Sequence, residues 1–205
     1  EVSEEVRKDK LFALYKKYAW IPVVVICSLV GGAGFLEYQK SAKANAASAR
    51  GDALIAALNQ DDASIRASEL ALISENGGDE APIAKLHRAG VLLEQDDIAG
   101  SLAVYDSMSG GDDIYSQVAM LKAIMIRGNK MDNDTRMQAL DAIATPGNAF
   151  RVIAMEQKAI AYIDMGNSDK AIEIFSTLIE EADVSQALIA RSKQMILALG
   201  GELAN

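Results

Sequence analysis

Apolar residues recur at a spacing of 35 positions from the middle of the chain to near its end. Four sets of four positions share this register, and all sixteen residues are apolar. The sets are Leu70, Tyr105, Leu140 and Phe175; Ile73, Met108, Ile143 and Leu178; Ala67, Leu102, Met137 and Ile172; and Leu54, Ala89, Ile124 and Ala159. A period of this length is typical of solenoids, whose stacked repeats bury one continuous core. The pattern therefore predicts an all-α stack of helix pairs.

Polar, turn-forming segments divide this region into short helices, because Gly, Asn and Asp favour turns and helix caps. The segments are Asn76–Asp79, Gly110–Asp113, Asn129–Asp132 and Pro146–Asn148. We expect helices at 40–59, 62–75, 80–94, 97–108, 113–128, 132–144, 148–165, 168–181 and 184–199. The last helix would cap the stack, as terminal elements do in repeat proteins. The repeat domain is expected to cover 61–205.

A long uncharged run, Ala19–Leu36, precedes the repeats. A helix needs about 20 apolar residues to cross the hydrocarbon core of a membrane. Tyr18 and Trp20 stand at one end of the run and Tyr38 at the other, where aromatic rings favour the headgroup level. The run therefore predicts a transmembrane helix at 19–38.

Charge predicts the orientation of this helix. Five bases and one acid lie between Arg7 and Tyr18, whereas Ala46 to the end holds 24 acids and 13 Lys plus Arg. An excess of Lys and Arg marks the cytoplasmic side. We expect a cytoplasmic tail at 1–18, a juxtamembrane helix at 39–60, and the repeats on the far side. A cleaved signal peptide, cut near Ala42–Ala46, is the rival interpretation; the long, aromatic-flanked run favours an anchor.

Composition narrows the possible functions. The net charge is −9, which argues against nucleic acid, because nucleic-acid binding needs a basic surface. Cys27 is the only cysteine and lies in the apolar run, so the repeats contain no disulfide and no thiolate metal site.

Few residues could support chemistry. His87 is the only histidine, so neither a zinc site nor a Ser-His-Asp set has enough partners. Acidic pairs recur at the turns: Asp61–Asp62, Asp96–Asp97 and Asp112–Asp113. They lack the alternate spacing of a calcium loop, and helix N-caps are the better interpretation. We expect no catalytic site, metal or cofactor, and a protein that is not an enzyme.

The repeat unit resembles the tetratricopeptide repeat, a helix–turn–helix of 34 residues. Its G-x2-Y place is held by Ala159-x2-Tyr162, and its A-x3-F place by Ala171-x3-Phe175. Gly166–Asp169 would form the turn between the two helices. The copy with Ser101 and Tyr105 is similar, while the others keep only the apolar spacing.

The resemblance implies that the first helix of each pair lines a groove. With the last copy setting the register, the inward positions include Gly90, Ile153 and Glu156, and the predicted partner-binding residues are Ile83, Leu86, Val118, Leu121, Met125 and Ile160. An apolar groove fits an amphipathic helix or an unfolded client. The alternative is that these residues pack against the long helix that follows the apolar run.

The whole plan is similar to the YfgM-like tetratricopeptide proteins, which include the ancillary subunit of the Sec translocon. The resemblance rests on Arg7–Leu11, Tyr15–Tyr18, a single span and an acidic helical domain. It implies a bacterial inner-membrane protein with periplasmic repeats, acting as a scaffold or chaperone-like factor at the translocon.

The alternative function is an accessory subunit of another inner-membrane complex, such as a respiratory supercomplex. In either case an integral membrane complex would pack against the transmembrane helix. Ser28, Gly31 and Gly32 are the predicted contacts, because small residues let helices approach closely in membranes; the alternative is that the glycines are there only because membrane helices tolerate glycine.

Overall fold

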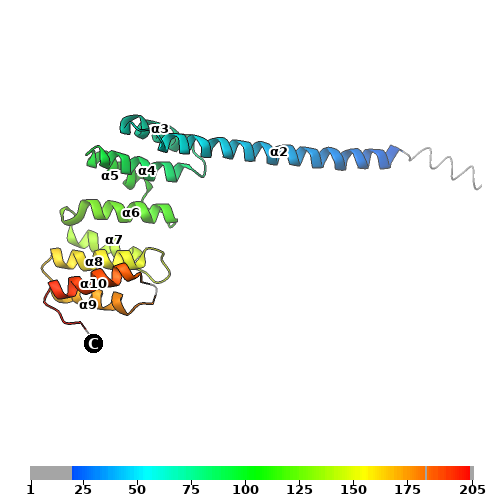
Figure 1. Ribbon diagram of the computed structural model, residues 1–205. Helices are drawn as coiled ribbons and strands as arrows, with labels where there is room; N and C mark the ends of the chain where they lie inside the picture. The colour runs from blue at the N-terminus through cyan, green and yellow to red at the C-terminus, as the bar shows by residue number, and fades with distance from the viewer. Residues whose placement is uncertain (1–19, 183, 204–205) are drawn as a thin grey trace, which may run out of the picture. The chain divides into compact units, whose positions relative to one another are not determined.

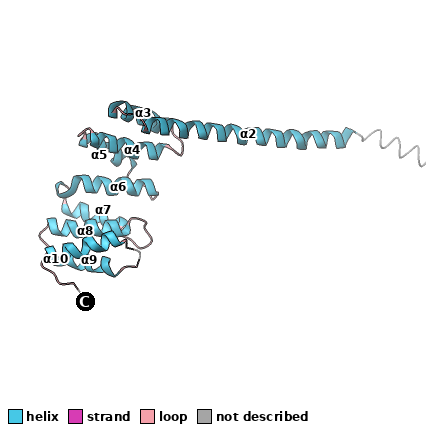
Figure 2. Cartoon of the chain, in the orientation of Figure 1, coloured by secondary structure: helices cyan, strands magenta, loops and turns pink. Residues whose placement is uncertain are grey.

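The structure is a computed structural model, and it describes residues 20–182 and 184–203. Within these ranges it contains nine α-helices, one short 3-10 helix and no strand (Figure 2). The predicted all-α class is therefore confirmed. The chain divides into two units between Ala53 and Leu54.

The first helix, α2, runs from Trp20 to Leu58 without a break. Its end lies one residue from the predicted end at Asn59. Between Phe35 and Arg50 every residue is exposed. The second unit begins at Leu54, so the last turn of α2 belongs to the repeat region.

The predicted transmembrane helix at 19–38 is wrong. Among the described residues, no helix combines the length and the apolar character that a membrane crossing requires. The described side chains of α2 begin at Gly31, and Glu37, Lys40 and Lys43 follow within a few turns, so the part of α2 whose side chains are described has no uncharged run of the about 20 residues that a crossing needs. The same finding overturns the predicted single-pass location in a bacterial inner membrane. The predicted cytoplasmic tail, 1–18, lies outside the described residues.

The other helices follow the predicted pairs, and their bounds differ from the predicted ones by three residues at most. They are α3 (Ala63–Asn76), α4 (Ala81–Glu94), α5 (Ile98–Met108), α6 (Ile114–Arg127), α7 (Asn133–Ile143), α8 (Arg151–Asp164), α9 (Ser168–Glu180) and α10 (Gln186–Ala198). The 3-10 helix, Gly128–Lys130, lies between α6 and α7 and was not predicted. Each helix from α3 to α10 contacts the next, and Figure 1 shows them packed together in one stack, with α10 against α9 near its end.

The residues that recur every 35 positions form the core of the stack. Leu70, Tyr105, Leu140 and Phe175 are each at most 1% exposed. None of the other twelve residues of the four sets is exposed. The buried residues form four clusters along the stack, and each cluster joins neighbouring helices. Because no helix pair can cover its own apolar face, successive pairs are held together by this shared burial.

The starts of the second helices follow the same register. Asp62, Asp97, Asp132 and Asn167 are the N-caps of α3, α5, α7 and α9, and each side chain accepts a hydrogen bond from a first-turn N–H. Asp113 caps α6 in the same way. The predicted role of the acidic pairs is thus confirmed for their second members, whose oxygens satisfy N–H groups that have no partner within the helix.

Candidate functional site

A hollow of about 680 Å³ opens beside α4 and is shared by several helices of the stack. We call it the hollow and define it by its lining: Leu58, Arg66, Leu86, His87, Gly90, Val91, Glu94, Tyr105 and Lys122. Five of the nine residues come from α4. The others come from the end of α2, from α3, from α5 and from α6, so the hollow depends on the stacking of consecutive helices.

The floor of the hollow is apolar and its edge is polar. Leu86 is half-buried and packs against the cluster that contains Tyr105. Gly90 has no atom within 4 Å of the place where a Cβ would stand, so the absent side chain leaves space beside Leu86. His87 and Lys122 are exposed at the edge. Burial raises the pKa of the Tyr105 hydroxyl, whose ionised form would lose its solvation there.

Arg66 holds the side chain of Glu94, the acidic residue in the lining of the hollow. Its Nη1 donates to the carbonyl oxygen of Gln60 at 2.7 Å, and its Nη2 donates to Oε2 of Glu94 at 2.6 Å. The side chain of Glu94 is 62% exposed, so water screens this pair. Glu94 is therefore paired within the protein, whereas Lys122 makes no ion pair with any described residue.

The structure brings some of the predicted groove residues to accessible positions and buries others. Leu86 lines the hollow, and Gly90 lies beside it. Met125 is 50% exposed on α6, and Ile83, Val118 and Ile160 are half-buried. Leu121 is only 5% exposed and belongs to the core between α6 and α8, so it is a packing residue rather than an open surface.

Two further residues of the predicted groove register are accessible in different degrees. Ile153 is 38% exposed. Glu156 is held by Arg191 of α10, whose Nε donates to Oε1 at 2.9 Å. Burial of Glu156 in this pair interrupts the apolar line on α8.

The predicted contacts of the apolar run lie on α2. Within the described residues, no atom comes within 4 Å of a Cβ built on Gly31 or Gly32. The side chain of Ser28 lies outside the described part. The structure therefore shows no packing partner at the two glycines.

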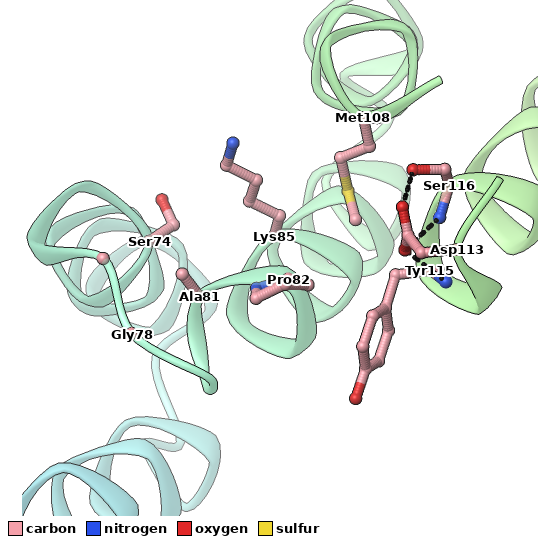
Figure 3. A pocket seen from close by; sticks show the side chains of 10 residues that line it. Ser74, Gly78, Ala81, Pro82, Lys85, Met108, Asp113, Tyr115 and Ser116 are labelled. Carbon is pink, nitrogen blue, oxygen red and sulfur yellow. Dashed lines mark hydrogen bonds between the residues drawn. The ribbon is translucent and has the colours of Figure 1, made fainter. Parts of the chain in front are cut away.

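A second recess lies where the α3–α4 and α5–α6 turns meet (Figure 3). It has a volume of about 380 Å³, and we call it the edge pocket. Its lining is Ser74, Gly77, Gly78, Ala81, Pro82, Lys85, Met108, Asp113, Tyr115 and Ser116. It shares no residue with the hollow. Figure 3 shows the thioether of Met108 pointing toward the middle, between Lys85 and the Asp113–Ser116 cap.

The two recesses contain residues that the sequence did not point to. Arg66 stands four positions before Leu70, and the corresponding residues of the later repeats are Ser101, Arg136 and Ala171. Arginine therefore alternates with a small residue at this position of the register. Lys85 has a basic counterpart in Arg50 of α2, whereas the corresponding residues of α6 and α8 are Met120 and Met155.

Comparison with known proteins agrees with this architecture. The profile of the tetratricopeptide repeat-like domain family matches residues 11–197, and the chain belongs to that family. Searches of curated proteins and of solved structures found no match. Stacked repeats of this kind form extended binding surfaces, and the chain is accordingly a protein-interaction scaffold of the tetratricopeptide type.

Proposed function

We propose that the protein is a non-enzymatic, chaperone-like scaffold that binds an amphipathic helix or an unfolded segment of a client along the first helices of its repeats. The observation that carries the proposal is the hollow beside α4, with the half-buried Leu86 on its floor and open space at Gly90. A recess of this volume accepts one or two large apolar side chains.

The proposed contact extends from α4 to α6 and α8. Met125 stands 35 positions after Gly90, at the same place on the next first helix, and it is half exposed. The unbranched thioether side chain of methionine adapts to partners of different shape. Ile83, Val118 and Ile160 supply further apolar surface beside it. An amphipathic helix presents anchors at i, i+3, i+4 and i+7, which suits a surface made of separate apolar contacts.

Kinship with the YfgM-like proteins is part of the proposal. It is supported by the family match, which begins at residue 11 and thus includes Tyr15–Tyr18. On this kinship the clients are polypeptides that emerge from a Sec translocon. A photo-reactive residue in place of Met125, illuminated in the native cell, should crosslink to such chains. If only stable, folded proteins were crosslinked, the proposed functional similarity to the YfgM-like proteins would be refuted.

Binding in solution tests the proposal directly. The probes are a permanently unfolded protein (reduced, carboxymethylated lactalbumin) and a labelled amphipathic-helix peptide. Met125→Glu should weaken binding of at least one probe by about tenfold or more, because a charge replaces an apolar contact. Leu86→Glu should act in the same direction.

The matched control is Leu72→Glu. Leu72 is 61% exposed on α3, which is a second helix, and it does not line the hollow. This variant should bind both probes as the wild type does. Because Leu86 packs partly into the core, thermal unfolding must show that each variant is folded. The proposal fails if Met125→Glu and Leu72→Glu bind equally well, or if the wild type binds neither probe.

A further inference from the structure

The edge pocket has a basic residue where the next two repeats have methionine, and the counterpart 35 positions earlier, Arg50 on α2, is basic as well. Lys85 lies in the first helix of its pair, and the equivalent residues 35 and 70 positions later are Met120 and Met155. Both methionines are partly buried and pack against the core clusters of their repeats. At the edge pocket a charged side chain replaces this packing. Local departures of this kind, in an otherwise regular sequence, are expected at functional sites.

The apolar part of the edge pocket suits one side chain of a partner. Figure 3 shows Pro82 and Ala81 on one side and the ring of Tyr115 on another, with Met108 between Lys85 and the cap of α6. The volume of about 380 Å³ exceeds that of a single leucine side chain, and the wall atoms at Pro82, Met108 and Tyr115 are mostly carbon. An apolar side chain placed there would lose water on several sides.

The charges of the edge pocket favour an acidic neighbour. Lys85 makes no ion pair or hydrogen bond with any described residue. The other ionised group, Asp113, is committed to the start of α6: its carboxylate accepts from the N–H groups of Tyr115 at 2.9 Å and Ser116 at 3.1 Å, and from the Ser116 hydroxyl at 2.5 Å. These hydrogen bonds stabilise the ionised Asp113 carboxyl and so lower its pKa. The carboxylate therefore already has three hydrogen-bond donors within the protein.

We infer that the edge pocket is a second partner-binding site, which takes a peptide segment carrying an apolar residue next to an aspartate or glutamate. The apolar side chain lies on Met108 and Pro82, and the carboxylate pairs with the ammonium group of Lys85. Charge-assisted hydrogen bonds of this kind are stronger than neutral ones. The site is separate from the hollow and does not depend on the proposed client binding there.

The test uses the full chain and two labelled peptides: Gly-Ser-Asp-Leu-Asp-Ser-Gly and the same peptide with Asn in place of Asp. Fluorescence anisotropy at low ionic strength, where charge pairs are least screened, gives the two affinities. The wild type should bind the Asp peptide about tenfold more tightly than the Asn peptide. Lys85→Met, which introduces the residue that α6 and α8 carry at the equivalent position, should remove that preference.

Two controls separate this site from the hollow. Met125→Glu should leave the Asp preference unchanged, and Lys85→Met should leave binding of the unfolded protein unchanged. Lys85→Glu should reverse the preference, because it places like charges together. The inference is overturned if the wild type binds neither peptide, if it binds both equally, or if Lys85→Met keeps the preference.

Discussion

Arg136 is buried, and its Nη1 lies 2.6 Å from Oδ2 of Asp164, 28 positions later in the chain. The same relationship occurs 70 positions earlier, where Arg66 donates to Glu94 at 2.6 Å across the same separation. In each case an arginine of a second helix reaches an acid in the last turn of the next first helix. Repeats that alternate with these, at Ser101 and Ala171, have a small residue instead.

The two ion pairs are expected to differ in their contribution to stability. The side chain of Arg136 is 3% exposed, so Asp164→Ala would leave a buried guanidinium without its counter-charge; we expect a loss of about 3 kcal/mol. Glu94 is 62% exposed, and Glu94→Ala should cost less than about 1 kcal/mol. Urea unfolding of both variants measures the difference. Equal losses would show that burial does not distinguish the pairs.

Alanine substitutions should distinguish the N-cap aspartates from the acidic residues next to them by their effect on the free energy of unfolding. Asp62 accepts from the N–H groups of Ser64 at 2.8 Å and Ile65 at 3.0 Å. Asp62→Ala should therefore lower the free energy of unfolding by about 1 kcal/mol, since two N–H groups lose their acceptor. Asp61→Ala is the control, because Asp61 is exposed and does not cap α3. Should Asp61→Ala cost as much, net charge rather than capping would explain the effect.

Acid should weaken the pair between Arg151 and Glu181, which links the start of α8 to the end of α9. Hydrogen bonds from Arg151 lower the pKa of Glu181 below its ordinary value of 4.5. A carboxyl with a lowered pKa in the folded state stabilises the protein above its unfolded pKa, and this contribution is lost as the pH falls through the folded pKa. Both groups are partly exposed, so we expect less than about 1 kcal/mol.

The measurement is the difference in unfolding free energy between wild type and Glu181→Gln. It should be largest near pH 7 and should shrink as the pH falls below 4.5. A difference that grows toward acid pH would mean that Glu181 is stabilised in its protonated form.

Two glycines are predicted to respond in opposite ways to alanine. A Cβ at Gly201 would lie 2.8 Å from Cγ2 of Ile196 and 3.2 Å from Cδ1 of Ile172, so Gly201→Ala should destabilise the last repeat by about 1–3 kcal/mol through overpacking. Gly90 is inside α4 and has open space around it. Gly90→Ala should raise stability by about 0.5–1 kcal/mol, because alanine loses less backbone entropy in a helix. Thermal unfolding of both variants tests the contrast, and the same sign for both would contradict it.

The sequence predicted the helices and the core more successfully than the surface. The 35-residue register specifies which residues are buried, because each repeat must present the same apolar face to the next; Leu70 and Phe175 show this at opposite ends of the stack. The turns were predicted because Asp and Gly have strong local preferences.

Three features could not be predicted from pattern alone. Leu121 was expected in the groove, but whether an apolar residue of a first helix faces the core or an opening depends on the neighbouring helices. Arg136 is buried only because Asp164 is brought beside it by the fold. The apolar run at the start of α2 was interpreted as a membrane span, and the described residues contain no such helix.

The central claim is that the first helices of the repeats bind clients, and an environment-sensitive dye tests it most directly. Cys27 is the only cysteine, so Cys27→Ser provides a background for labelling at Met125→Cys or, as a control, at Leu72→Cys. On addition of reduced, carboxymethylated lactalbumin, the dye at 125 should shift its emission to the blue while the dye at 72 does not. A shift at 72 alone, equal shifts at both positions, or no shift at 125 would contradict the account.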